Sequence, residues 1–238
     1  MVGGERGARS YRSPARAERA RRTRRAVLTA AREVFTARGY AATTVRAVAA
    51  AAGVSTATVE LLFGTKAALV RAAVDVAIAG DDEPVPMLDR GWAHDARDAA
   101  TPEAAIAVAV RTIGPAQERS AGLLLAVLEG ATRDVELAEV ADRMVEQRAV
   151  TAGWIVDLLA GLAPLRPGLS RADAVDTVWL LMEPSIFDRL TRRRGWSTAR
   201  YQEWLASTMR TLLFPDPPST DPPSTDPPST DPAPGGSP

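Results

Sequence analysis

The most informative spacing in the chain is Ala49-x3-Gly53-x5-Val59, which is typical of a helix-turn-helix. A small residue at Ala49 lets the second helix cross closely, and Gly53 permits the positive φ of a sharp turn. Such a unit lays its second helix in the major groove of DNA, where side chains contact base edges. An ordinary hairpin of two helices with a glycine turn can show the same spacing.

Candidate base contacts lie at the start of the second helix of this motif, because the amino-terminal end of such a helix faces the bases. The sequence offers Thr56, Ala57 and Thr58 there. Threonine hydrogen-bonds to several bases, and alanine suits a thymine methyl group. The predicted phosphate contacts are Thr44 and Ser55, which cap expected helices, and Lys66, the only lysine in the chain.

Charge is distributed unevenly along the 238 residues, although the net charge is zero. Residues 1–75 carry 14 Arg/Lys and 5 Asp/Glu, giving 14 − 5 = +9, and the remainder carries 15 − 24 = −9. A basic front and an acidic back indicate that only the front meets phosphate. Further DNA-contact candidates are Arg21, Arg24 and Arg46.

Helical periodicity dominates, and no segment shows strand alternation, so we predict an all-α fold. A helix over residues 18–38 should stop at Gly39, and three short helices should follow it to residue 79. Residues 80–92 read as a linker, followed by helices over 101–117, 120–130 and 135–162, a helix broken at Pro184, and a last helix ending near Phe214. The expected parts are a disordered basic arm (1–17), a helix-turn-helix domain (18–75), a helical domain (76–214) and a disordered Pro-rich DPPST-repeat tail (215–238).

The composition offers few candidate catalytic residues. The chain has no Cys and a single His, His94, in an expected loop. We find no nucleophile, base or ligand cluster, and we predict no enzyme, no cofactor and no metal site. Asp81-Asp82-Glu83 could hold a hard cation, although a solvated turn explains it as well. No apolar run is long enough for a membrane span and no secretory signal is visible, so we expect a cytoplasmic protein.

Residues 24–72 resemble the DNA-binding domain of the tetracycline-repressor (TetR) family. The matching signatures are Phe35-x3-Gly39-Tyr40, Thr43-Thr44-Val45, Ala49-x3-Gly53-Val54-Ser55, and Phe63 with Lys66. The resemblance implies a bacterial regulator that binds a near-palindromic operator as a homodimer, with two recognition helices about one DNA turn apart. It also implies a carboxy-terminal helical domain that forms the dimer and holds a small-molecule effector, whose binding releases the DNA. Repression is the family expectation.

Two sets of residues in the back half are assigned on this basis. The linker and the long middle helix flank the family's usual cavity, so Met87, Trp92 and Trp154 are the candidate ligand contacts. The last helices should form the dimer interface, with apolar side chains suited to that role. These are Trp179, Ile186, Leu190, Trp204, Leu205, Met209 and Leu212.

Glu60 departs from the family pattern, which usually has a phosphate-contacting Tyr there, and Leu62 stands where His or Tyr is common. Glu60 could accept a hydrogen bond from cytosine N4, pair with Arg46, or remain solvated. It could also mark a helical interaction protein that has lost specific DNA binding, which is the alternative function. The surplus of about nine positive charges favours retained binding, because the phosphate term grows with the number of contacts.

Overall fold

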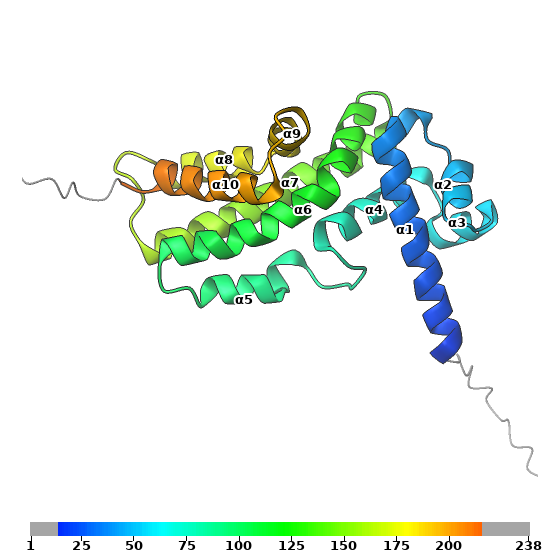
Figure 1. The fold of residues 1–238 in the computed structure, drawn as a ribbon, viewed down its shortest axis with the longest axis horizontal. Helices are drawn as coiled ribbons and strands as arrows, with labels where there is room; N and C mark the ends of the chain where they lie inside the picture. The colour runs from blue at the N-terminus through cyan, green and yellow to red at the C-terminus, as the bar shows by residue number, and fades with distance from the viewer. Residues whose placement is uncertain (1–13, 216–238) are drawn as a thin grey trace, which may run out of the picture.

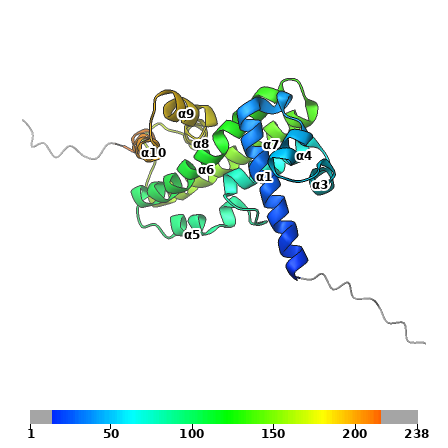
Figure 2. The same cartoon turned by 45° about the vertical axis from the view of Figure 1, so that its right-hand side comes forward.

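The computed structural model describes residues 14–215, and every regular element within that range is helical (Figure 1). The predicted all-α fold is therefore confirmed. Four helices gather at one end of the molecule in both views (Figures 1 and 2). They are α1 (Pro14–Ala42), α2 (Val45–Ala51), α3 (Thr56–Phe63) and α4 (Lys66–Ala79). Residues 1–13 of the predicted arm and the DPPST tail from residue 216 lie outside the described residues.

The first helix begins earlier than predicted. It starts at Pro14 rather than at residue 18, so the last four residues assigned to the arm are helical. Proline is well suited to a first helical position, and the Ala, Arg and Glu residues that follow favour helix. The helical geometry breaks at Gly39, where φ is 74°, as the sequence predicts.

Side-chain caps fix where most of the helices begin. A Ser, Thr or Asp side chain accepts a backbone N–H from the first turn of each capped helix, which satisfies an otherwise unpaired donor. The sequence signals the starts of these capped helices correctly, and a new helix begins at the predicted Pro184 break. The capping residues are Thr44, Ser55, Thr65, Thr101, Asp134, Ser170 and Ser197.

The segment predicted as a linker contains more structure than expected. A 3₁₀ turn, η1 (Met87–Asp89), leads into α5 (Gly91–Arg97). His94 therefore lies on an exposed helical turn and not in a loop. The acidic triplet is also not a free turn, because Asp81 and Asp82 each pair with an arginine.

A single long helix, α6 (Pro102–Ala131), replaces the two helices predicted over 101–130. It runs through Pro115, and Gln202 donates a hydrogen bond to the Val110 carbonyl just ahead of that proline. The helix stays continuous because it is packed along most of its length. Its first half belongs to the carboxy-terminal core and its last half to the amino-terminal core.

The remaining helices surround α6. α7 (Val135–Leu162) runs beside it, and α8 (Arg171–Leu181) and α10 (Thr198–Leu213) lie at the end of the molecule away from α1–α4 (Figure 1). Between them come α9 (Pro184–Asp188) and a π-helical turn, η2 (Arg189–Arg193). α1 and α4 share a hydrophobic core with α6 and α7. The helix-turn-helix end is therefore joined to the long helices by packed side chains.

No single helix within residues 14–215 is both long and apolar enough to cross a bilayer. Only α2 and α3 taken together, as a pair bent by 110°, meet the length and composition requirement.

Candidate nucleic-acid interface and ligand cavity

The helix-turn-helix forms as the spacing predicts. The axes of α2 and α3 are bent by 110°, within the range usual for this motif. Gly53 occupies the turn with φ of 67°, a conformation that costs L-residues energy. Val48, Ala49 and Val59 are buried between the two helices. These contacts hold α3 as a rigid element whose outer face is open to a partner.

The outer face of α3 carries few polar groups. Ala57, Glu60 and Leu61 are exposed, and Leu61 has 88% of its surface accessible. Thr56 and Thr58 are half-buried, and the Thr58 hydroxyl lies 2.8 Å from that of Ser55. Leu61 was not singled out from the sequence. An apolar residue two turns into a recognition helix could have been recognised as a candidate contact.

Glu60 does not pair with Arg46. No ion pair forms between them within the described part of the chain, and both side chains are exposed. The hypothesis that Glu60 holds Arg46 in position is therefore not supported by this structure. Glu60 is instead free to meet whatever faces α3.

The predicted basic DNA contacts differ in the contacts that their side chains already make within the chain. Arg21 is exposed and pairs with Glu18 at 3.0 Å. The Arg24 guanidinium lies 4.7 Å from the ring centroid of Phe63, at the end of α3. The Lys66 ammonium lies 3.9 Å from the Tyr40 ring centroid, and partial desolvation lowers the pKa of Lys66. Lys66 must leave this ring if it is to reach a phosphate.

The Thr44 hydroxyl serves its own helix. It accepts the Ala47 N–H at 3.1 Å and is exposed. The neighbouring Thr43 is buried instead, and its hydroxyl donates to the Gly39 carbonyl at 2.8 Å. Thr44, Ser55 and Arg46 thus remain at the exposed edge of the helix-turn-helix, where the prediction placed them.

A cavity of about 790 Å³ lies behind the helix-turn-helix, between α4, the 81–90 segment, α6 and α7. Its walls are largely apolar, with Leu124, Met144 and Val145 among them. Met87 and Trp92 line it, as predicted. Trp154 does not line it. That ring packs edge-on against Trp92 at 5.2 Å and so supports the wall from behind.

Two polar side chains that line the cavity come from the two long helices, α6 and α7. Gln117 on α6 donates from Nε2 to the Met182 carbonyl, and Oε1 of this 7%-exposed side chain has no partner among the described residues. Arg148 on α7 pairs with Glu183 and lies 4.5 Å from the Trp179 ring centroid. Neither residue was singled out from the sequence, because a lone Gln or Arg within a helix belongs to no recognisable sequence motif.

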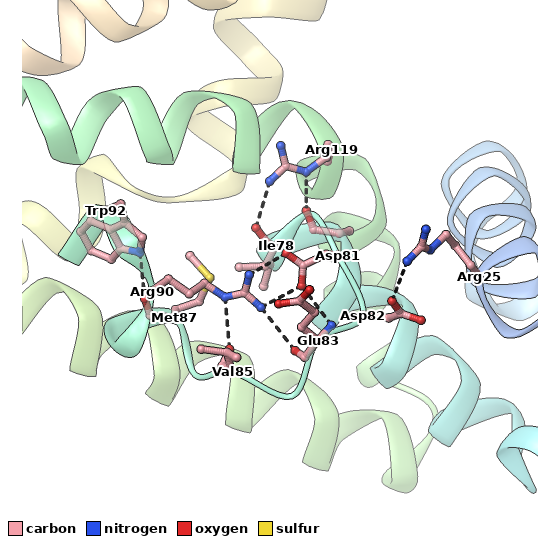
Figure 3. Close-up of polar contacts among 11 residues, drawn as sticks. Arg25, Ile78, Asp81, Asp82, Glu83, Val85, Met87, Arg90, Trp92 and Arg119 are labelled. Carbon is pink, nitrogen blue, oxygen red and sulfur yellow. Dashed lines mark hydrogen bonds and ion pairs between the residues drawn. The ribbon is translucent and has the colours of Figure 1, made fainter. Parts of the chain in front are cut away.

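The segment over residues 81–90 forms one wall of the cavity and is tied down on several sides (Figure 3). Arg90 binds both carboxylate oxygens of Asp81 at 2.7 and 3.0 Å and also donates to the Val85 carbonyl. Asp82 pairs with Arg25 of α1 at 3.1 Å. Arg119 of α6 donates to the carbonyls at the end of α4. The wall is thus joined directly to the first helix of the helix-turn-helix domain.

The proposed dimer residues fall into two groups. Leu205 and Met209 are fully buried in the carboxy-terminal core of this chain, so they cannot form an outer surface. Their positions on α10 point inward because this helix packs against α6. Trp179, Ile186, Leu190 and Trp204 are half-buried, and Leu212 is 41% exposed. Leu180, 55% exposed on α8, joins this surface although the sequence did not single it out.

A sequence profile described as "Bacterial regulatory proteins, tetR family" matches residues 27–73. No curated protein sequence matches the chain. Among solved structures, the transcriptional regulator FadR from Bacillus subtilis, in complex with stearoyl-CoA, is similar with a TM-score of 0.61 at 16% identity, covering 79% of this chain and 97% of its own. NalD, the secondary repressor of the MexAB-OprM multidrug efflux pump in Pseudomonas aeruginosa, has a TM-score of 0.60 at 21% identity, covering 82% and 97%.

A third similar structure is a transcriptional regulator from Saccharomonospora viridis in complex with choline, with a TM-score of 0.59, 17% identity and coverage of 81% and 98%. The chain therefore has the all-α fold of these proteins, with a helix-turn-helix near its amino-terminal end. Residues 27–73 match the TetR-family model, and the chain has the fold of TetR-family structures, so the predicted resemblance is confirmed.

Proposed function

We propose that the chain is a ligand-responsive, sequence-specific DNA-binding regulator that binds a near-palindromic operator as a homodimer and represses until a small molecule releases it. The observation that carries this proposal is the pairing of an open recognition helix with a cavity whose wall is joined to α1. Two structurally similar regulators are crystallised with ligands, stearoyl-CoA and choline. Their ligands differ in kind, so the fold alone leaves the effector class of this chain open.

The contacts between the 81–90 wall of the cavity and α1 offer a physical route by which ligand binding could release the DNA. Arg25 of α1 pairs with Asp82, while Arg24, one residue earlier, lies over Phe63 at the end of α3. A ligand that moves the 81–90 segment therefore pulls on the helix that supports α3. Two recognition helices must keep a fixed spacing to bind one duplex, so a small shift weakens operator binding.

The predicted DNA contacts remain Arg21, Arg24, Thr44, Arg46, Ser55, Thr56, Ala57, Thr58, Glu60 and Lys66. Since Arg46 does not hold Glu60, we propose a direct contact between Glu60 and cytosine N4, the major-groove donor of a C·G pair. The alternative, an interaction protein that has lost specific DNA binding, is favoured by one observation. The exposed face of α3 presents a carboxylate and Leu61 but no cation.

Selection of duplexes from a random pool, at two salt concentrations, tests the proposal. Enrichment of an inverted repeat that weakens steeply with salt is the expected result, because phosphate contacts release counterions. If no sequence is enriched at either salt, the regulator hypothesis fails and the interaction protein takes its place.

A further inference from the structure

The charges around the cavity are unequal. Three arginines line it, but the Arg90 charge is balanced by Asp81 and the Arg148 charge by Glu183. Only Arg24 is left without a carboxylate partner among the described residues, and it lies over Phe63 at the cavity edge.

Three carboxylates line the same cavity without an ion-pair partner in the described part of the chain. They are Asp75 on α4, and Glu83 and Asp89 in the 81–90 segment. Desolvation raises the pKa of Asp75, and the charges of Arg71 and Arg143 oppose that shift without cancelling it. An incoming positive charge stabilises the ionised form of a carboxylate that lies beside an apolar wall.

A second observation comes from the buried polar side chains of the lining. Gln117 is 93% buried, and its Oε1 is an acceptor without a partner among the described residues. The buried Nε donor of Arg148 is also without a hydrogen-bond partner there, but the charge of this arginine is balanced by Glu183. Leaving an acceptor such as the Gln117 oxygen unpaired costs free energy that a donor from a ligand recovers. An N–H donor suits this oxygen, whereas a carboxylate would face it with a second acceptor.

We propose that this cavity selects organic cations, namely molecules with an apolar body and a single protonated amine, with Asp75 as the principal counter-charge. The apolar walls take the body, and Trp92 adds an aromatic face that attracts a cation. Fatty acids and other carboxylates should bind more weakly, because the unpaired charges of the lining are three carboxylates against one arginine, Arg24. This inference rests on the proposed ligand-binding function and names its ligand class.

The test is isothermal titration calorimetry of the full chain with three probes that share one apolar body: decylamine, decanol and decanoate. At neutral pH they are cationic, neutral and anionic. We expect decylamine to bind at least about tenfold more tightly than either of the others. Equal affinity for decanol, tighter binding of decanoate, or no binding by any probe would overturn the inference.

Two variants assign the effect to the site. Asp75→Asn should lower the decylamine affinity about tenfold and leave decanol binding unchanged. Glu139→Gln removes an exposed carboxylate on α7 that does not line the cavity, and it should change neither value. If both variants weaken decylamine equally, the preference arises from general surface charge and the assignment to Asp75 is wrong. DNA selection is independent of these titrations, so failure here leaves the DNA-binding proposal standing.

Discussion

At the residue scale, the proposed function rests on side chains that the fold leaves without an ion-pair partner among the described residues. Glu60 is exposed on α3, and Asp75 faces an apolar cavity without an ion-pair partner among the described residues. Burying a charged group without a partner costs free energy, so folded chains usually pair such groups or leave them hydrated. These two groups are therefore the ones whose substitution should change binding more than it changes the fold.

Glu60→Gln should relax the preference for cytosine at one position of each half-site. A glutamine amide can donate as well as accept and pairs well with adenine, so the discrimination lost should be about 1–3 kcal/mol. Binding affinities for duplexes that differ only at that position measure it. Uniform tightening on every duplex would show instead that Glu60 only repels phosphate.

Asp75→Asn should stabilise the free protein at neutral pH. The folded state raises the pKa of Asp75, so the ionised carboxylate destabilises the fold once the pH exceeds its unfolded value of about 3.9. The gain should be small, about 1–3 °C in Tm, because Asp75 is an exposed residue and solvent screens its charge. It should disappear below about pH 3, where the carboxyl is protonated in both states. A gain that persists in acid would point to packing and not to charge.

At the element scale, the short helices and their turns were predictable because their signals are local. The Ser, Thr and Asp caps act through their side chains on the next turn, whereas Gly39, Gly53 and Pro184 act through their own backbone, and the structure bears them out. The continuity of α6 was not predictable, since it depends on helices far away in the sequence that pack around it. The cavity lining was missed for the same reason: Asp75, Gln117 and Arg148 come from three different helices.

Gly53→Ala should destabilise the helix-turn-helix through its backbone alone. A Cβ at this position meets no atom within 4 Å, so the expected cost of about 1–2 kcal/mol is that of holding an L-residue at φ of 67°. Gly161→Ala on α7 is the matched control, because it also meets no atom but has helical geometry. Urea denaturation should show a loss for the first variant and none for the second. Equal effects would mean that the turn carries no special strain.

At the scale of the whole molecule, a monomer places only one recognition helix on DNA. We propose that apolar side chains left exposed or half-buried on α8 and α10 contact the second subunit. They are Trp179, Leu180, Trp204 and Leu212. Sequence reasoning located these helices correctly but could not separate outward from inward residues on α10. Burial of Leu205 and Met209 depends on how α10 is rotated against α6.

Leu212→Asp should weaken dimerisation at least about tenfold, because a charge would be desolvated in the proposed apolar interface. Sedimentation velocity across a concentration series measures the change. Val135→Asp is the control, since Val135 is 80% exposed at the start of α7 on another part of the molecule. If the wild-type chain sediments as a monomer, or if both variants dissociate equally, the assigned surface is wrong.

The central claim is that α3 reads DNA sequence. It is tested most directly by the affinity of the purified chain for an enriched inverted repeat and for a scrambled duplex of the same composition, measured across a salt series. We predict a preference for the repeat of about 10³-fold or more, with both affinities falling steeply as salt rises. Equal affinities for the two duplexes at every salt concentration would contradict the claim and leave only non-specific attraction between the basic front and phosphate.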